Sequence, residues 1–260
     1  MILRSVIAHA RRQEWTAVGI ELAIVVLGVF IGIQVSNWNV ERETNARGAI
    51  FAERLKADLR EEAWYYQLQI EYSRDVLANA ERAVAGLSGN STDADEALLI
   101  NAYRATQYKQ RARRRSTYDE LVSTGTIGLI KSTTLRDTAL QVYNFYTLDN
   151  LAREGAQSRY REAFRMSLPN EVQRALARNC GDRYVSTGDY KALDELIDYP
   201  CSTGLPAKAI DEAVTVLRAN AALVPLLRLR IADIETRLVD LTGNNREIMK
   251  GLQAIAAERR

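Results

Sequence analysis

The segment "GIELAIVVLGVFIGIQVSNWN", residues 19–39, is the stretch that decides the fold. The apolar run extends from Ala17 to Val35, and a helix of that length covers about 28 Å, close to the hydrocarbon thickness of a bilayer. Trp15 and Trp38 bracket the run at positions where aromatic rings favour the headgroup level. We therefore predict a transmembrane helix over residues 15–38, with the lipid bilayer as its surroundings.

A cleavable signal peptide is the main alternative for this apolar run. Its apolar core is usually about 7 to 15 residues long and ends at a cleavage site of small residues. The flanking stretch "IQVSNWNVER", residues 33–42, offers no such site. The sequence thus favours an uncleaved anchor.

The orientation of the span depends on the basic residues beside it. Counting within about 20 residues of the span does not decide the orientation, because both flanks are basic: Arg4, Arg11 and Arg12 on one side, and Arg42, Arg47, Arg54 and Lys56 on the other. Closer to the span, and with a free amino terminus, the leading segment is the more positive flank. We expect residues 1–14 to form a cytoplasmic tail and residues 39–260 to lie on the other side of the membrane.

The sequence contains two cysteines, Cys180 and Cys201, and the segment between them has Gly and Pro at its edges. In an oxidising compartment a disulfide between them would stabilise the fold by about 3 kcal/mol on loop-entropy arithmetic. The alternative is two unrelated buried thiols acting as small apolar side chains. Export of the main domain favours the disulfide.

Composition predicts the fold class. The chain has 35 Lys plus Arg and 33 Asp plus Glu; residues 1–16 hold three Arg and one Glu, which leaves 32 of each in residues 17–260. A formally neutral domain is not typical of a nucleic-acid-binding protein. Four prolines in 260 residues, together with long stretches rich in Ala, Leu, Arg and Glu, predict an all-α fold.

Two heptad seams predict how these helices pack. The first predicts a helix that starts near Asn39 and ends within residues 86–95, where turn-forming residues gather. Because each seam is too narrow to bury itself, we expect the transmembrane helix to continue into an elongated antiparallel helical bundle. The seams comprise Leu59, Ala63, Tyr66, Ile70, Ser73, Leu77, Ala80, Val84 and Leu87, and Leu227, Ile231, Ile234, Leu238, Leu241, Asn245, Ile248, Leu252 and Ile255.

Local signals place further helix boundaries. A second helix is predicted from about Asp93 to Arg115. Pro225 is predicted to kink a helix that carries the second seam. Asn245 either fixes the register of that seam or belongs to a helix break at "TGNN", residues 242–245, and the break is favoured.

The middle of the chain carries cap signals. Thr117 and Glu120 have the spacing of a capping box, and Gly125 is placed to end that short helix. Ser132 or Thr133 is predicted to cap the next helix. The apolar connector "GTIGLI", residues 125–130, is expected to be buried.

These residues resemble a known family. Glu21, Gly28, Gln34 and the triplet 37–39, Asn-Trp-Asn, followed later by "TYDELVSTGTIGLIKSTTLRD", residues 117–137, resemble an uncharacterised bacterial family of single-pass membrane proteins. The resemblance covers the first 40 residues and residues 117–145. The chain departs from the pattern with Gly-Ile-Glu in place of Gly-Glu and with Val40 in place of an acid. The resemblance implies a single span in the bacterial inner membrane with a periplasmic main domain, and it implies no activity.

A polar stripe inside the span predicts how the protein assembles. An ionisable side chain in a membrane faces a partner or water by default, and the same face carries the small-x-x-x-small spacing that lets two helices approach closely. The alternative is an acid that snorkels to the interface near Trp15 on a monomeric anchor. We predict self-association or docking onto another membrane protein through Glu21, Val25, Gly28, Gly32 and Val35, which step by 4,3,4,3.

Patterns for catalysis or metal binding are sparse. His9 is the one histidine and precedes the span, which excludes a Ser-His-Asp triad and a His-rich metal site in the main domain. Two cysteines this far apart form neither a zinc ribbon nor a redox Cys-x-x-Cys motif. The acids at 61–62 and 93–96 are interpreted as surface residues. We predict no catalytic residue, cofactor or metal, and hence no enzyme.

Two local clusters have competing interpretations. The run "KQRARRR", residues 109–115, is predicted to be solvated, and contact with anionic headgroups or an acidic partner is the alternative. Trp64 and Tyr65 point away from the first seam and are predicted to pack on other helices rather than to form a partner surface.

Three hypotheses for function remain. The favoured one is an anchored helical interaction or scaffold protein that self-associates or docks onto a membrane complex through its span. The second is a periplasmic sensory or ligand-binding bundle. The third is an accessory subunit of a membrane enzyme or channel that uses Glu21 as a proton-active group.

Overall fold

The computed structural model describes residues 15–92 and 94–257, and over these residues the regular secondary structure is helical, with no strand. The predicted all-α class is confirmed. The chain divides into two compact units. The first comprises the chain up to Glu53 together with Gly128–Lys131, and the second comprises Arg54–Ile127 and Ser132–Arg260.

The first unit contains the beginning of α2, which extends over Trp15–Leu87. From Gly19 to Glu43 its side chains are exposed all round, and Gly48 is the first buried residue. A Cβ on Gly48 would lie 2.6 Å from the carbonyl oxygen of Leu129, so glycine permits the close approach of the last residue of η1 (Ile127–Leu129). The prediction that the connector 125–130 is buried is wrong for most of its length: Ile130 is fully buried, but Gly125 and Gly128 are exposed and no residue of η1 is buried.

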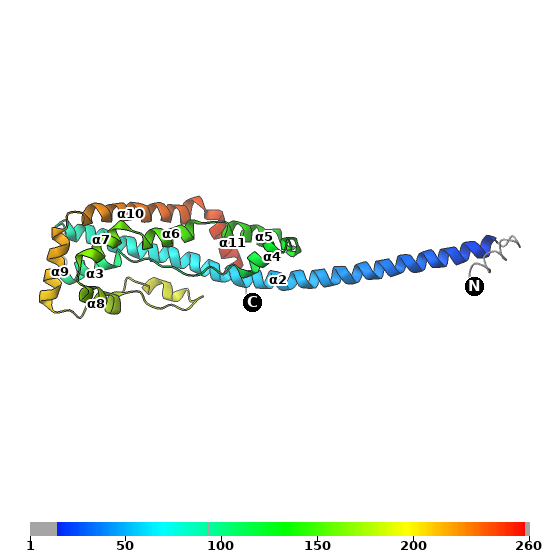
Figure 1. Ribbon diagram of the computed structural model, residues 1–260, viewed down its shortest axis with the longest axis horizontal. Coiled ribbons are helices and arrows are strands. Elements are labelled where there is room, and N and C mark those ends of the chain that lie inside the picture. The colour runs from blue at the N-terminus through cyan, green and yellow to red at the C-terminus, as the bar shows by residue number, and fades with distance from the viewer. Residues whose placement is uncertain (1–14, 93, 258–260) are drawn as a thin grey trace. The chain divides into compact units, whose positions relative to one another are not determined.

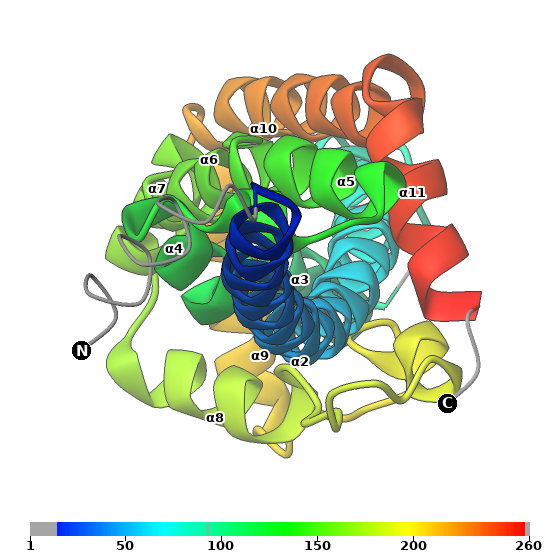
Figure 2. The ribbon, with the colours of Figure 1, turned by 90° about the vertical axis from the view of Figure 1, so that its right-hand side faces the viewer.

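The second unit contains the remainder of α2, and here the predicted narrow seam is wrong. The seam residues Leu59, Tyr66 and Ile70 are buried as expected, but so are residues on the other sides of the helix, including Trp64, Tyr65, Leu68 and Tyr72. A helix that is buried all round is enclosed by other elements. Figure 2, viewed along α2, shows the other helices of this unit distributed around that part of it.

The helix α2 ends at a glycine C-cap. Gly89 adopts a φ of +75°, and its N–H donates to the Gly86 carbonyl while the Asn90 N–H donates to the Ala85 carbonyl. These two bonds form a Schellman motif, which satisfies carbonyls left over at the helix end. The predicted end within residues 86–95 is confirmed.

The predicted helix from Asp93 to Arg115 is wrong in its second half. Asp93 lies outside the described residues, α3 extends over Asp95–Arg104, and residues 107–115 form a segment without regular secondary structure. Arginine side chains of this segment bind carboxylates on α2, as described below.

The predicted capping box is also wrong. In α4 (Ser116–Ser123) Thr117 is buried inside the helix, and its N–H donates to Asp58 of α2 at 3.3 Å, so a neighbouring helix supplies the cap. Gly125 does end α4, with a φ of +69°. Ser132 caps α5 (Thr133–Tyr143) by accepting from the Leu135 N–H at 3.2 Å, as predicted.

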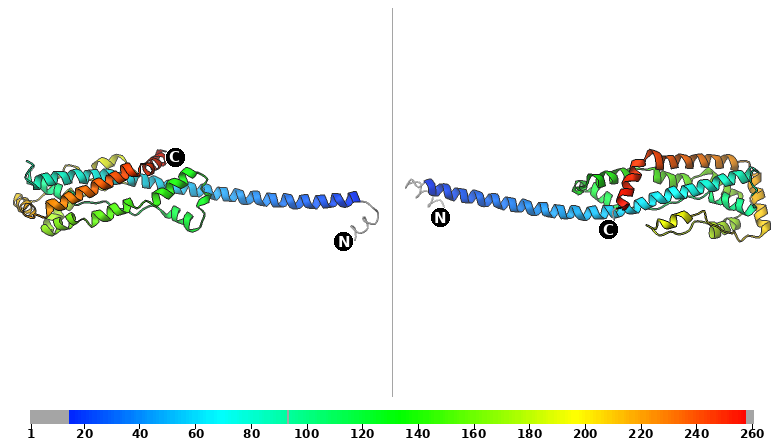
Figure 3. Two further views of the ribbon diagram at one scale, coloured as in Figure 1. Left: turned by 90° about the horizontal axis from the view of Figure 1, so that it is seen from above. Right: turned by 180° about the vertical axis from the view of Figure 1, so that it is seen from behind.

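The rest of the chain forms a series of helices that are much shorter than α2 (Figures 1 and 3). In Figure 1, α9 lies across the end of the second unit, where it connects α8 to α10. In chain order these are α6 (Thr147–Ala156), α7 (Arg159–Ser167), α8 (Asn170–Cys180), η2 (Lys191–Glu195), α9 (Ala207–Ala219), α10 (Leu223–Val239), the π-helical turn η3 (Asp240–Asn244) and α11 (Arg246–Ala257).

The second predicted seam is interrupted once, and a further helix break lies upstream of it. Pro225 does not kink a continuous helix, because α9 ends at Ala219 and the proline lies in the first turn of α10, where its missing N–H is not needed. The favoured break at "TGNN" is present: a π-helical turn precedes Asn245, and α11 starts at Arg246. Ile234, Leu241, Ile248 and Leu252 are buried nonetheless.

The main apolar core of the second unit joins the end of α2 to five other helices. Ala80 and Ala83 of α2 are fully buried in it, and a Cβ on Gly86 would lie 2.6 Å from Leu98 Cδ1 of α3, so glycine permits this close approach. The other members come from α3, α7, α8, α9 and α10 and include Leu98, Leu99, Tyr160, Phe164, Leu176, Val214, Leu217, Leu223 and Leu227.

Candidate functional site

The predicted association face lies in the first unit and is uncovered. Glu21, Val25 and Val35 are exposed, and a Cβ added to Gly28 or Gly32 would meet no atom within 4 Å. At 3.6 residues per turn these five positions occupy one side of the helix. The structure leaves that side open to the close approach of another helix.

The residues predicted as interface anchors frame this face. Trp15 and Trp38 are 68% and 61% exposed, and the Arg42 guanidinium lies 6.0 Å from the centre of the Trp38 ring. Between them α2 is long and apolar enough to cross a membrane, and none of its most apolar 18-residue window is buried.

The second unit contains a cluster that sequence reasoning interpreted wrongly. Of the run predicted to be solvated, Arg111 donates to Glu61 at 2.7 Å, Arg114 donates to Glu61 at 3.0 Å, and Arg113 donates to Glu62. Glu62 is not a surface residue, because only 2% of it is exposed. It also accepts the Arg114 backbone N–H at 2.8 Å. The segment 111–114 is thus fixed to α2 by charge-assisted hydrogen bonds.

The two carboxylates differ in their electrostatics. Burial raises the pKa of Glu62, although Arg113 opposes the rise. Burial also acts on Glu61, but the hydrogen bonds from Arg114 and Arg111 outweigh it, so the pKa of Glu61 is lowered. Breaking a buried pair such as Glu62 with Arg113 costs far more than breaking an exposed one.

Aromatic residues complete this cluster. The Arg111 guanidinium lies 5.6 Å from the centre of the Trp64 ring, and Arg113 lies 6.0 Å from that of Tyr143. The Tyr143 hydroxyl donates to the Arg114 carbonyl at 2.6 Å, and the Trp64 indole donates to the Asp189 carbonyl at 3.1 Å. Trp64 and Tyr65 are buried, so the prediction that they pack on other elements holds.

Cys180 and Cys201 form a disulfide in the structure. Arg104, which is almost fully buried, lies beside it and donates to the Tyr199 carbonyl at 2.7 Å and to the Cys180 carbonyl at 3.4 Å. Arg104 and Arg82 also pair with Asp198. The disulfide and these two arginines hold the long loop between α8 and α9 against α2 and α3.

Metal-binding geometry is absent among the described residues, in which no three His, Cys, Asp or Glu side chains are grouped for an ion. His9 lies outside the described residues, as do the tail predicted at residues 1–14 and its arginines. The lack of a catalytic residue and of a cofactor stays a prediction.

The chain matches no protein-family model, no curated protein and no solved structure. The resemblance of residues 1–40 and 117–145 to a single-pass membrane family therefore stays a prediction.

The arginine cluster did have a sequence signal. Arg111, Arg113 and Arg114 concentrate positive charge within four residues. Opposite them stand the adjacent acids Glu61 and Glu62. Neither pattern reveals that the two segments meet, because their contact depends on the tertiary fold.

Proposed function

We propose that this protein is a membrane-anchored helical interaction protein that assembles through the first part of α2. The observation that carries the proposal is the uncovered apolar surface there, which contains one acid, Glu21, on the same side as Gly28 and Gly32. The second unit is its helical domain outside the lipid.

The apolar surface supports a membrane location. Leu22, Ile24 and Leu27 are each 58–64% exposed, and so are the apolar residues around them. Exposed apolar area costs about 25 cal/mol per Å² in water, and patches of this extent mark membrane or protein contacts. A bilayer covers such a helix on all sides, whereas one soluble partner would cover one side.

Glu21 supports assembly within that membrane. A carboxylate surrounded by lipid is costly and by default faces a helix partner or water. Gly28 and Gly32 lack side chains on the same face, so a second helix can approach closely enough to bury Glu21. The occupant of this face is a second copy of the chain or a span of another membrane protein.

The compartment is inferred from the disulfide and the flanking charges. A disulfide persists in oxidising compartments, and Cys180 and Cys201 lie in the second unit. We place this unit in the periplasm of a bacterium and the amino terminus in the cytoplasm, with the anchor in the inner membrane.

Native mass spectrometry of the full-length protein in detergent tests the assembly. Wild type is compared with Glu21→Leu and Gly28→Ile, which change the face. Two matched controls change other sides of the same helix: Gln34→Leu removes a polar side chain, and Ala23→Ile adds bulk.

The proposal predicts a defined oligomer or heterocomplex that dissociates in the two face variants and persists in the two controls. A monomeric mass for wild type, or equal dissociation in all four variants, would contradict it.

A further inference from the structure

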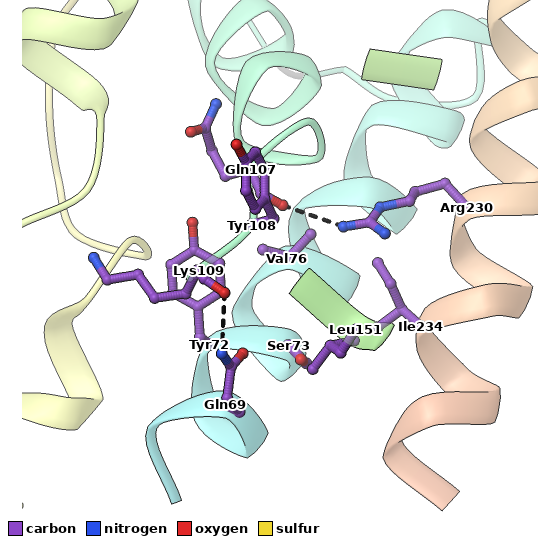
Figure 4. A pocket seen from close by; sticks show the side chains of 10 residues that line it. All are labelled: Gln69, Tyr72, Ser73, Val76, Gln107, Tyr108, Lys109, Leu151, Arg230 and Ile234. Carbon is purple, nitrogen blue, oxygen red and sulfur yellow. Dashed lines mark hydrogen bonds between the residues drawn. The ribbon is translucent and has the colours of Figure 1, made fainter. Parts of the chain in front are cut away.

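A small cavity of about 10 Å³ lies in the second unit between α2, the segment 107–109 and α10. Figure 4 shows the side chains around it, with Arg230 reaching in from α10. A cavity of this size holds about one water-sized group. Its wall contains the Ser73 hydroxyl and the apolar side chains of Val76, Leu151 and Ile234.

Arg230 is a buried cation without a matching anion. It is 6% exposed, its Nη2 donates to the Gln107 carbonyl at 3.2 Å, and its Nε has no hydrogen-bond partner. Among the described residues no carboxylate oxygen lies within 4.0 Å of its nitrogens. A buried charge is costly unless it is paired.

The neighbouring charges do not compensate Arg230. Asp233 and Glu154 act on it from a distance, and Glu154 is held by Arg237 in a bidentate pair at 2.7 and 2.9 Å. Arg161 adds a second cation: its Nη1 donates to the Thr106 carbonyl at 3.1 Å, and its guanidinium lies 4.9 Å from the centre of the Tyr108 ring.

The packing around the guanidinium is tight. A Cβ on Gly155 of α6 would lie 2.4 Å from the Tyr108 Cβ and 3.4 Å from Arg230 Nη2. A large ligand therefore has no room beside the guanidinium, and a monatomic ion fits the available volume.

We propose that this cavity binds a chloride-sized anion, with the Arg230 guanidinium as its charged donor and the Ser73 hydroxyl in its wall. The anion neutralises a cation that the fold otherwise leaves unpaired between α2 and α10. Binding to the folded state alone stabilises that state as the anion concentration rises.

Thermal unfolding of the detergent-solubilised full chain tests this site. Sodium chloride is exchanged for sodium gluconate, whose anion is too large for the cavity, at constant ionic strength. We expect the Tm of wild type to rise by about 3 °C for each tenfold increase in chloride above the dissociation constant. Arg230→Met should abolish the dependence, whereas Arg228→Met, an exposed arginine on the same helix, should keep it.

An equal Tm in both salts, or the same chloride dependence in the Arg230 variant, would overturn the proposal. If Arg230→Met does not fold, crystals of wild type grown in bromide decide the matter. An anomalous peak in the cavity supports the anion site, and a water without anomalous signal overturns it.

Discussion

One helix, α2, has two parts with opposite surroundings. From residue 19 to residue 43 its apolar side chains are exposed all round, whereas between residues 59 and 73 even Glu62, Gln69 and Ser73 are buried. Two of these buried polar groups have partners, since Glu62 binds Arg113 and Gln69 donates to the Lys109 carbonyl. An uncovered apolar part and an enclosed part that buries polar side chains have different surroundings, which is why we infer a bilayer for the first part.

Of the changes considered, charged residues introduced into the exposed part of α2 should have the largest effect. Ile24→Arg with Phe30→Arg would add about 2.5 to 3.5 kcal/mol of insertion cost per arginine. We expect the double variant to leave the membrane fraction, as measured by immunoblotting after carbonate extraction. Val122→Arg, on an exposed position of α4, is the control and should remain with the membrane. Equal retention of all three proteins would argue against a membrane span.

In the enclosed part, Arg113→Met leaves Glu62 buried without its partner. We expect a loss of about 3 to 5 kcal/mol in the free energy of unfolding, and partial recovery when Glu62→Leu is added. Urea unfolding followed by circular dichroism measures both. The exposed pair of Arg115 with Asp119 is the control, for which Arg115→Met should cost at most about 1 kcal/mol. Similar losses for the two pairs would show that Glu62 is not enclosed.

Removing the disulfide should have a somewhat smaller effect. Replacing Cys180 and Cys201 together with Ala opens a loop closed over a separation of 21 residues and should cost about 3 kcal/mol. Urea unfolding of the variant and of oxidised wild type measures the difference. Free thiols in protein purified from membranes without reductant would contradict both the bond and the oxidising compartment.

The smallest effect is a pH dependence in the enclosed part. Burial, with Asp198 nearby, raises the pKa of Asp75 from 3.8 to about 6, and its Oδ2 has no hydrogen-bond partner. An acid whose pKa is raised in the folded state binds its proton more tightly there. Asp75 therefore stabilises the folded state below pH 4, and this contribution to the free energy of unfolding is lost as the pH rises through about 6.

Asp75→Asn, which cannot ionise, should raise the Tm at pH 7.5 and leave it nearly unchanged at pH 4, as measured by calorimetry. Asp211→Asn, at an exposed position of α9, should change neither value. A variant that is less stable at pH 7.5 than wild type would show that the ionised carboxylate is favourable where it lies.

The sequence was sufficient to predict features that depend on local chemistry. The helical class, the end of α2 within residues 86–95, a cap at Ser132 or Thr133 and the apolar run all follow from side-chain type and spacing. The association face was named from the same kind of pattern, and the structure places its residues on one uncovered side of the helix.

The sequence was not sufficient where distant segments meet. The heptad spacing predicted that α2 is buried along one narrow seam. Because other helices surround this part of α2, residues outside the seam, such as Trp64 and Tyr72, are buried as well. The arginines of residues 111–114 were predicted to be solvated because their acidic partners lie about 50 positions away in the chain. The cap of α4 was missed for the same reason, since Asp58 of α2 supplies it.

Hydrogen–deuterium exchange of the full-length protein in lipid nanodiscs tests the comparison most directly. The backbone of α2 is helical throughout, so differences in exchange report what surrounds each part. We predict slow exchange at residues 19–38, if lipid covers them as proposed, and at residues 59–76, which other elements enclose, with faster exchange at residues 40–47. Exchange at residues 19–38 that is as fast as at residues 40–47 would contradict the membrane span.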